Sequence, residues 1–523
     1  MNRCSRFAIC ALAVALCAFA LPTMAQMTSV GIDCSQISQY HLMAQENMRA
    51  GAALIECGVV KGGGTPSQRE EEDNYPQPPN VLVSNRTCTS QTSCTKSESM
   101  VWGSPDGQTI VTNYNDHNSA QNGTYAGISY SADAGATFTE LEPDPLATGH
   151  SSNYGDPIVV YNQKLGLWFA GDLVGGCGGQ GIGLWTSTDG ITWTTGACAH
   201  NGSFDDRESF WVDNDPTSAG YGRMYISWND FNYTCGAGGC LFVTYSDNGT
   251  TWSSPVQLNS GTFLRDVQIT GAQISPTANR AALNGYDSVF LATMDEGGGG
   301  AATRQNIMFR SNNGGTSWTQ VTMGPRFNPV GDSSCGYFYQ VNPIIRHMGW
   351  GEPAVGPNNV VHYVYAGAGT NNDHGDIFYQ RSTDNGATWS TPIELNTDPD
   401  QQYHEQWMPS LSVNPGGKLT ASWYDRRQAN SACNSYTDVG CSYNRYARQS
   451  PDNGVTWGTD FQVTSSLSPQ PSQLDGGVVS CYAGDYDYNT ARGSTAYSTW
   501  TDGRRSINSI PVQDVNFAPI PED

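Results

Sequence analysis

The sequence predicts an all-β fold, and three observations support this prediction. Of the 523 residues, 59 are glycine and only 14% are charged, whereas 26 are tyrosine and 14 are tryptophan. This composition favours a protein rich in turns and strands over a helical or a disordered one. A short motif that ends in an aromatic residue also recurs along the chain, which favours one large repetitive domain.

The chain is strongly acidic. Its 48 acidic and 25 basic residues give a net charge of −23, and only four of the basic residues are lysine. Such a protein repels the phosphates of nucleic acids and the headgroups of anionic membranes. We therefore expect no nucleic-acid partner.

The first 25 residues have the pattern of a secretory signal peptide. Arg3 and Arg6 precede an apolar run over 7–21, and a short segment ending at Ala25 follows. The run is short for a membrane anchor, and no later segment approaches the length of a transmembrane helix. We expect a signal peptide over 1–25, no membrane span, and a secreted or periplasmic protein.

Twelve cysteines remain after removal of this signal, an even number that suits disulfides in an oxidising compartment. The spacings match no zinc motif, so structural bridges are favoured over metal thiolates. Sequence proximity predicts five local pairs and leaves a sixth by elimination. The pairs are Cys34–Cys57, Cys88–Cys94, Cys177–Cys198, Cys235–Cys240, Cys433–Cys441 and, last, Cys335–Cys481.

Two short regions precede the main domain. Residues 26–60 predict a helical segment, because apolar residues have helical spacing between Ser35, a possible cap, and Leu54. Residues 61–79 are rich in glycine, proline and acidic residues and predict a linker. The main domain is expected over 80–523.

Six copies of the recurring motif set the repeat. In each copy a glycine lies three residues before the aromatic residue, and successive aromatic residues are 55 to 71 positions apart. This period suits a unit of several strands. The copies are Ser131–Phe138, Thr186–Trp193, Tyr245–Trp252, Ser311–Trp318, Ser382–Trp389 and Ser450–Trp457.

The motif itself predicts a tight turn. An Asp or Asn side chain can accept backbone N–H groups, the glycine can adopt a positive φ, and the aromatic ring can cover the turn. Calcium binding or catalysis by these acids is the alternative. Asn313 replaces the acid in one copy, which favours the structural role. We expect no cofactor, with a structural calcium ion left open.

Four strands can be recognised around each motif. In the fifth unit they span 352–355, 360–366, 377–381 and 389–395. A seventh unit without the motif contains strands over 484–488, 494–501 and 507–515 but lacks a fourth. Residues 80–84 can supply it from the other end of the chain and close the ring. The sequence thus predicts a seven-bladed β-propeller, with six blades as the alternative.

The six motifs resemble the Asp-box, or BNR, repeats of sialidase-like β-propellers, and the resemblance covers about residues 80–517. The phrases Trp423–Arg427 and Trp500–Arg505 also resemble exported bacterial sialidase-like proteins. Sialidases, other glycoside hydrolases, polysaccharide lyases and non-enzymatic propellers share this motif, so the resemblance implies fold more than chemistry. The sialidases' Phe-Arg-Ile-Pro segment is absent, since 97–102 contains no arginine, which argues against cleavage of sialic acid.

Acidic residues fall near the start of the first strand of each unit, where a propeller lines its central channel. Neighbouring carboxylates raise one another's pKa, which suits an acid/base pair in glycoside hydrolysis. They could instead bind backbone N–H groups of the adjacent blade. The acidic positions are Glu98, Asp156, Glu208, Asp266, Glu352, Glu405 and Asp485, and the catalytic candidates among them are Glu208, Glu352, Glu405 and Asp485.

Four arginines near strand ends, Arg207, Arg265, Arg426 and Arg504, are candidates for binding a substrate carboxylate such as that of a uronic or sialic acid. The alternative is that they form ion pairs between blades. Nearby aromatic residues could stack on sugars, or a tyrosine among them could act as nucleophile, or they could simply pack between blades. These are Trp407, Tyr424, Tyr482 and Tyr486.

These observations favour an exported monomeric propeller that acts on or binds extracellular glycans or glycoconjugates, with glycoside hydrolysis as the candidate reaction. A non-catalytic propeller that binds glycan or protein ligands is the alternative. No metal site is assigned.

Overall fold

The computed structural model describes residues 26–63, 80–84, 95–117, 124–272, 285–341, 345–370, 372–399, 403–429, 442–469, 473–507 and 510–522. The predicted signal peptide, most of the predicted linker and the predicted pairs Cys88–Cys94 and Cys433–Cys441 lie outside these ranges. No helix in the described ranges is long and apolar enough to cross a membrane.

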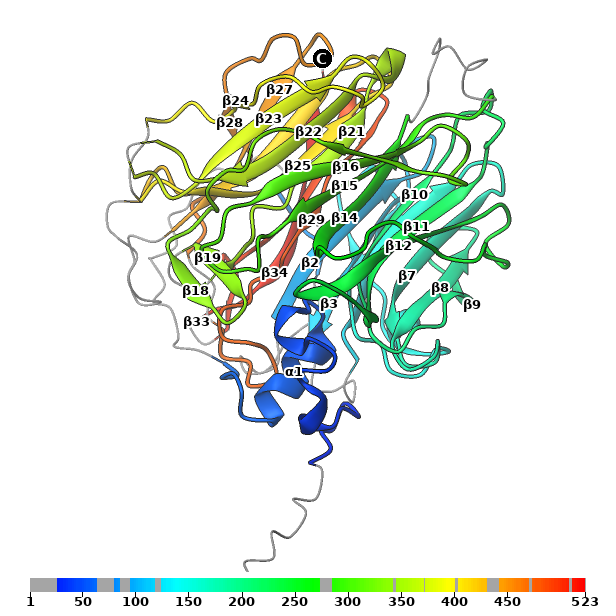
Figure 1. The fold of residues 1–523 in the computed structure, drawn as a ribbon. Coiled ribbons are helices and arrows are strands. Elements are labelled where there is room, and N and C mark those ends of the chain that lie inside the picture. Colours follow the sequence, from blue (N-terminus) through cyan, green and yellow to red (C-terminus); the bar gives the residue numbers. More distant parts are fainter. Residues whose placement is uncertain are drawn as a thin grey trace, which may run out of the picture.

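The described chain is mostly β-structure, and seven of its sheets have four or five strands (Figure 1). The first sheet contains β2 (Thr95–Gly103), β3 (Ile110–His117), β4 (Ala126–Ser131) and β5 (Thr139–Glu140). The second contains β6 (Ile158–Asn162), β7 (Leu167–Val174), β8 (Gly181–Ser187) and β9 (Trp193–His200). The third contains β10 (Asp205–Val212), β11 (Met224–Cys235), β12 (Gly238–Ser246) and β13 (Val256–Gln257).

The fourth sheet contains β14 (Leu264–Gly271), β15 (Val289–Asp295), β16 (Gln305–Ser311) and β17 (Thr319–Thr322). The fifth contains β21 (Glu352–Val355), β22 (Val361–Gly367), β23 (Asp376–Ser382) and β24 (Ile393–Glu394). The sixth contains β25 (Gln406–Val413), β26 (Leu419–Asp425), β27 (Asn444–Ser450) and β28 (Phe461–Gln462). The seventh is ordered β30 (Thr490–Arg492), β31 (Thr495–Asp502), β34 (Asp514–Pro521) and β1 (Val81–Leu82). Smaller sheets are formed by β18 (Ser333–Cys335), β19 (Phe338–Val341) and β20 (Ile345–Arg346), and by β32 (Ser506–Ile507) and β33 (Ile510–Pro511).

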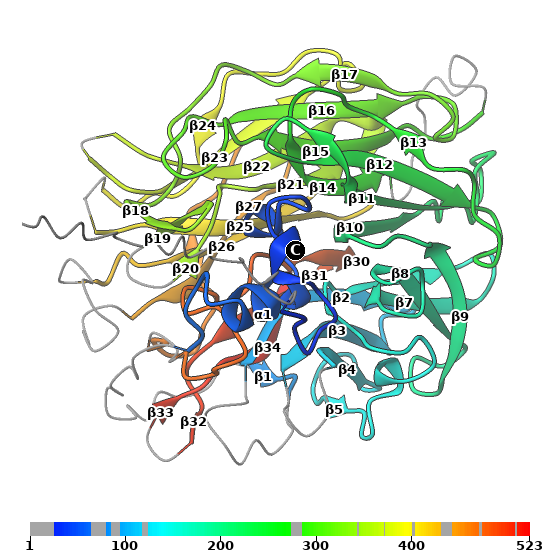
Figure 2. The same ribbon diagram turned by 60° about the horizontal axis from the view of Figure 1, so that its bottom comes forward.

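The first strands of the seven sheets form a closed ring. Each contacts the next in the order β2, β6, β10, β14, β21, β25, β30 and back to β2. Figure 2 shows the sheets around the N-terminal segment, which lies near the centre of this view. The fold is therefore the radial arrangement of four-stranded sheets that the repeat predicts, with the first strand of each sheet innermost.

The predicted closure of the ring is confirmed. Strand β1 pairs with β34, with Val81 opposite Phe517, and Val83 N donates to Val515 O at 2.9 Å. Two strand predictions in the seventh unit are wrong. Within 484–488, β29 (Asp487–Tyr488) joins β2 in parallel instead of starting the seventh sheet, and the third strand there is β34, not 507–515.

The predicted turn chemistry is also confirmed. Asp384 Oδ1 accepts from the N–H groups of Ala387 and Thr388, at 3.1 and 2.8 Å, and Gly386 has a φ of +76°. In the third copy the accepting side chain is Asn248, whereas Asp247 pairs with Arg223. Two of the six turns thus use an amide, as expected of a structural element that needs an acceptor and not a charge.

The N-terminal segment is less helical than the apolar spacing predicts. Two 3₁₀ turns, η1 (Cys34–Gln36) and η2 (Leu42–Ala44), precede the helix α1 (Met48–Glu56). His41 has a left-handed backbone with φ +49°, which interrupts the predicted helix, and Asn47 caps α1 by accepting from Ala50 N at 2.9 Å.

Four predicted disulfides are confirmed. They are Cys34–Cys57, Cys177–Cys198, Cys235–Cys240 and Cys335–Cys481. Disulfides of this number are typical of an oxidising compartment.

Two other short 3₁₀ turns complete the described helical structure, η5 (Pro145–Ala147) and η7 (Pro357–Asn359). Buried tryptophans such as Trp185, Trp423 and Trp500 pack in hydrophobic clusters with residues of several sheets, and their burial stabilises the ring.

Candidate functional site

The candidate site lies at the end of the ring where the first strands begin. The repeated turns follow the third strands, which run parallel to the first strands, so these turns lie at the opposite end of the ring. The N-terminal segment covers the end where the first strands begin (Figure 2). We call the buried polar cluster at this end, centred on Glu46, the axial site.

A backbone distortion recurs where the first strands begin. Glu98, Asp156, Arg207, Asp266 and Met408 all have positive φ, between 49° and 66°, and in four of the five sheets the pairing register shifts beside them. Such bulges re-aim side chains and increase strand twist. In the third and sixth sheets the distorted residues are thus Arg207 and Met408, whereas the comparison of the repeated sequence units predicts Glu208 and Glu405 at these positions.

Several ring carboxylates bind the backbone of the neighbouring sheet. Asp156, Asp266 and Glu352 each accept an N–H group from the next sheet or just before it, and Glu98 accepts one from the segment before β29, at 2.7 to 3.0 Å. The alternative interpretation of these residues predicts such bonds. The pairs are Glu98 with Asp485 N, Asp156 with Arg207 N, Asp266 with Gly351 N and Glu352 with Leu411 N.

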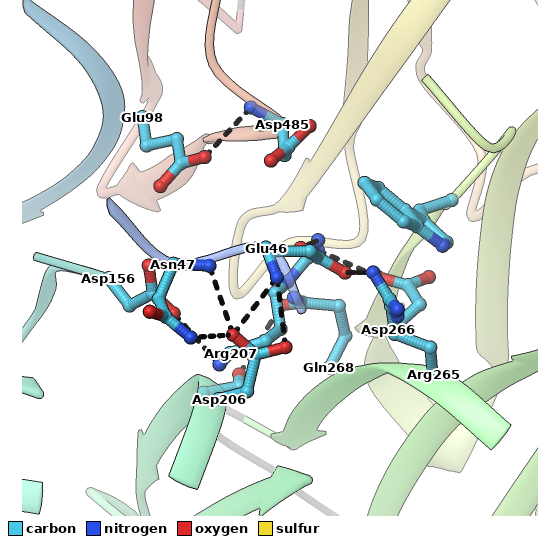
Figure 3. Close-up of polar contacts among 12 residues, drawn as sticks. Glu46, Asn47, Glu98, Asp156, Asp206, Arg207, Arg265, Asp266, Gln268 and Asp485 are labelled. Carbon is cyan, nitrogen blue, oxygen red and sulfur yellow. Dashed lines mark hydrogen bonds and ion pairs between the residues drawn. The ribbon is translucent and has the colours of Figure 1, made fainter. Parts of the chain in front are cut away.

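A carboxylate from the N-terminal segment occupies the axial site (Figure 3). Glu46 Oε2 accepts from Arg207 Nη1 and its Oε1 from Arg265 Nη1, each at 2.8 Å. The backbone N–H groups of Glu46 and Asn47 donate to Asp206 at 3.0 to 3.1 Å. The segment is therefore held by its charge and its backbone together.

A third arginine supports the same segment. Arg346 Nη2 donates to the backbone O of Glu46 at 2.8 Å, and its Nε donates to Asp485 Oδ1 at 2.9 Å. Asp485 in turn donates its N–H to Glu98, so these residues form one connected network.

Carboxyl groups outnumber arginines in this network, and this imbalance affects the protonation of the carboxyl groups. Burial opposes ionisation of Glu46, but Arg207 and Arg265 outweigh it and lower the pKa of Glu46. Burial raises the pKa of Asp206 to about 6 and that of Asp266 to about 7. Near neutral pH the site therefore combines an ionised Glu46 with an Asp266 that is only partly ionised, whereas Asp206, whose pKa is lower, has largely lost its proton.

Aromatic rings enclose the arginine side of the site. Tyr486 and Tyr488 stack at 4.7 Å between ring centroids, and the Arg207 guanidinium lies 4.4 Å from the Tyr486 ring and 4.8 Å from the Trp350 ring. Arg207 Nη2 also donates to the Tyr488 hydroxyl at 2.9 Å. These contacts hold the guanidinium in place and exclude water from it.

Of the eight predicted catalytic and binding residues, three belong to this network: Arg207, Arg265 and Asp485. The others lie elsewhere. Arg426 pairs with Glu405 at 3.3 Å in the sixth sheet, beside the buried Trp407. Arg504 pairs with Asp502 at 2.7 Å in the seventh.

The remaining catalytic candidates are Glu208 and Glu352, and both are buried. Glu352 is held by Ser410 and Leu411 of the next sheet. Neither oxygen of Glu208 has a hydrogen-bond partner among the described residues, and burial, with Asp156 and Asp172 nearby, raises the pKa of Glu208 far above its usual range.

Among the predicted aromatic residues, Tyr486 contacts the site directly, whereas Tyr482 lies at its edge, where its hydroxyl accepts from Ser97. Trp407 and Tyr424 stack on each other in the sixth sheet.

Beyond the axial site the channel contains a cavity of about 60 Å³ lined by Ser209, Gln268, Glu352 and other residues. This cavity has room for a few water molecules but not for a sugar.

Sequence reasoning missed Glu46, Asp206 and Arg346. Glu46 lies in the segment predicted to precede the domain, so no repeat pattern points to it. Asp206 could have been found as the acidic neighbour of Arg207 at the start of β10, whereas Arg346 lies in β20, outside the four-stranded repeat.

No family model matches the chain, and no curated protein matches it. Solved structures with a similar fold include an α-L-arabinofuranosidase from Fusarium graminearum, 12% identical over 84% of this chain and 97% of that one, with a TM-score of 0.41. A polysaccharide lyase described as an ulvan lyase is 11% identical over 89% and 95%, with a TM-score of 0.46. An α-L-arabinanase from Penicillium chrysogenum is 11% identical over 84% and 97%, with a TM-score of 0.41.

Proposed function

We propose that this protein is an exported seven-bladed β-propeller that binds acidic sugars of extracellular glycans at the axial site. The observation that carries the proposal is the Glu46 carboxylate, which is buried between the guanidinium groups of Arg207 and Arg265. A uronic acid presents the same group, and paired guanidiniums recognise it with good geometry.

Other observations support the fold and the location in this proposal. The closed contact ring of seven first strands supports seven blades. Four disulfides support an exported protein, as does the signal-like sequence over 1–25.

A ligand carboxylate can reach this position only if Glu46 leaves it. The exchange of one carboxylate for another preserves both arginine pairs, so the cost is that of moving the segment around Glu46. The apparent affinity is then reduced by the fraction of molecules in which this segment is displaced. We therefore expect weak binding to the intact protein and stronger binding when Glu46 is shortened.

Binding without catalysis is favoured over hydrolysis by one specific observation. The ring carboxylates Asp156, Asp266 and Glu352 each hold a neighbouring sheet through a backbone N–H group, and Glu98 holds the segment before β29 in the same way. Hydrolysis stays the second candidate, with Asp485 the predicted catalytic residue nearest to the bound carboxylate, and with Glu208, Glu352 and Glu405 as further candidates.

Chemical rescue tests the carboxylate site. The Glu46→Ala variant is titrated with acetate and glucuronate while its melting temperature is followed, with chloride and glucose at matched ionic strength as controls. We expect both carboxylates to raise the melting temperature of Glu46→Ala and to have much less effect on wild type. Equal responses to glucuronate and chloride would contradict the proposal, because they would show screening and not a site.

A second experiment separates binder from hydrolase. Wild type and Glu46→Ala are incubated with uronate-containing and neutral polysaccharides, and both binding and new reducing ends are measured. Retention on acidic polysaccharides without new reducing ends indicates a binder. Reducing ends that disappear in Asp485→Asn indicate a hydrolase. The absence of both binding and turnover with every acidic polysaccharide tested overturns the proposal.

A further inference from the structure

Three potential metal ligands meet between the second and third sheets. His200 ends β9, Asp205 begins β10 and Asp230 lies in β11. Each offers one ligand atom, and these three atoms all lie within 4.8 Å of one another. The short connection from β9 to β10 and the pairing of β10 with β11 bring the three residues together.

The two carboxylates face each other across paired strands. Asp205 and Asp230 are register partners of β10 and β11, and both are buried, at 0% and 4% exposure. Like charges directly opposite on paired strands are destabilising, and burial increases that cost. A cation between them removes it.

One of these oxygens is left over. Asp205 Oδ2 lies 2.6 Å from His200 Nδ1, but Asp205 Oδ1 has no hydrogen-bond partner among the described residues although it is shielded from solvent. Asp230 Oδ1 accepts from the backbone and the side chain of Asn232, each at 2.8 Å, which fixes its orientation. A buried carboxylate oxygen without a partner calls for a ligand.

A second trio does not qualify. His150 lies near Cys177 and Cys198, but these two cysteines form a disulfide and cannot act as thiolates.

We propose that His200, Asp205 and Asp230 bind a divalent first-row transition metal ion such as Zn²⁺ or Mn²⁺. One imidazole nitrogen and two carboxylate oxygens suit these ions, whereas Ca²⁺ favours oxygen ligands throughout. The His200 side chain is 20% exposed, so the ion can enter from solvent and keep water in its remaining positions. Ligand atoms about 2 Å from the metal lie about 3.3 Å apart, so His200 and Asp205 need to separate only slightly.

The ion would lie beside the strand start that holds the N-terminal segment. Gln180 donates to the backbone O of Asp205 at 2.6 Å and accepts from Arg49 Nη1 at 2.9 Å. The next residue, Asp206, accepts from the backbone of Glu46. The bound metal would therefore stiffen the support of the axial site without entering it.

The test is metal binding to the untagged, folded protein after dialysis against a chelator. Zn²⁺ and Mn²⁺ are titrated with calorimetry, the content is checked by elemental analysis, and Ca²⁺ serves as the competing ion. We expect one transition-metal ion per chain, a higher melting temperature on binding, and at least tenfold weaker binding in His200→Ala and Asp205→Asn.

The matched control is His117→Ala. His117 pairs with buried Asp475 and is 15% exposed, yet it belongs to no such trio among the described residues. Binding must survive in this variant, and an equal loss in His117→Ala and His200→Ala overturns the proposal.

If His200→Ala fails to fold, the visible absorption of wild type loaded with Co²⁺ tests whether the metal site exists. Bands of nitrogen and oxygen coordination at one equivalent support the site. Absence of such bands, or absence of one bound ion in the titration, overturns the proposal.

Discussion

The side chains of Glu46 and Arg207 lie 161 positions apart in the sequence but form a buried ion pair of 2.8 Å, with 1% exposure on each side. Arg265 binds the other oxygen of the same carboxylate at the same distance. The N-terminal segment is therefore part of the structure of the ring, and its charge is part of the axial site.

We expect Glu46→Gln to lower the free energy of unfolding by about 3 kcal/mol, because it removes a charge shared by two buried guanidiniums. Arg207 then keeps only Asp266, at 2.9 Å, and Arg265 keeps Glu296, at 3.8 Å. Urea unfolding followed by tryptophan fluorescence measures the loss. The matched control is Asp247→Asn, which breaks the pair with Arg223 at a site where Asp247 is 59% exposed, and which should cost less than about 1 kcal/mol. Similar losses in the two variants would mean that the buried pair contributes no more than a surface one.

The second prediction concerns pH and Glu352. Burial raises the pKa of Glu352 to about 8, against the hydrogen bonds from Ser410 and Leu411, while a glutamate in the unfolded chain titrates near 4.5. Between these values the unfolded chain has lost the proton and the folded protein keeps it. The contribution of Glu352 to stability therefore falls as pH rises from about 4.5 to about 8, by up to about 1.4 kcal/mol per pH unit, and is level outside this window.

The measurement compares wild type with Glu352→Gln, whose side chain cannot titrate. Urea unfolding at each pH unit from about 5 to about 9 should show wild type losing stability relative to the variant, and the difference should stop changing above about pH 8. A difference that is constant with pH would show that Glu352 is ionised in the folded protein.

The sequence alone predicts the features that repeat. The six turns could be predicted because each depends on residues a few positions apart, such as Asp384 with the N–H groups of Ala387 and Thr388. The closing strand could be predicted because one unit lacked its fourth strand, which left an unpaired edge for 80–84.

The axial site could be predicted only in part, for two physical reasons. The bulge at Arg207 shifts the pairing register, and in a strand a shift by one residue exchanges the side chain that points inward, here Arg207 for Glu208. Glu46 reaches the site through a long-range contact of a non-repeating segment, and nothing local to Glu46 encodes its partner.

We expect Gly386→Ala to destabilise the protein by more than the cost of its backbone alone. Gly386 has a φ of +76°, and an added Cβ would lie 2.8 Å from Phe290 Cε1. Gly493→Ala isolates the backbone cost of about 1 to 2 kcal/mol, since Gly493 has a φ of +56° and open space around it. Thermal unfolding of both variants should show the larger loss for Gly386→Ala, and equal losses would mean that the turn does not pack against the adjacent sheet.

The closing strand should contribute through Val83, which is fully buried and donates its N–H to Val515 O. We expect Val83→Ala to cost about 2 kcal/mol in urea unfolding, because it leaves a small cavity beneath the strand. Val455 is 61% exposed, so Val455→Ala should change stability by less than about 0.5 kcal/mol. A neutral Val83→Ala would indicate that the ring does not depend on this strand.

The last prediction compares two disulfides of very different span. Cys335–Cys481 joins residues 146 positions apart, whereas Cys235–Cys240 joins residues five apart. In the chain-entropy model a bridge stabilises the fold by restricting the unfolded chain, by about 5 kcal/mol for the long loop and about 2 kcal/mol for the short one.

We therefore expect the double variant Cys335→Ser with Cys481→Ser to lose about 3 kcal/mol more than Cys235→Ser with Cys240→Ser in urea unfolding at the same pH. Both cysteines are replaced in each case so that no free thiol remains. The long bridge also anchors the β18–β19 hairpin near the axial site, so glucuronate rescue of Glu46→Ala should weaken when it is removed. Equal losses from the two bridges would show that native contacts, and not chain entropy, determine what they contribute.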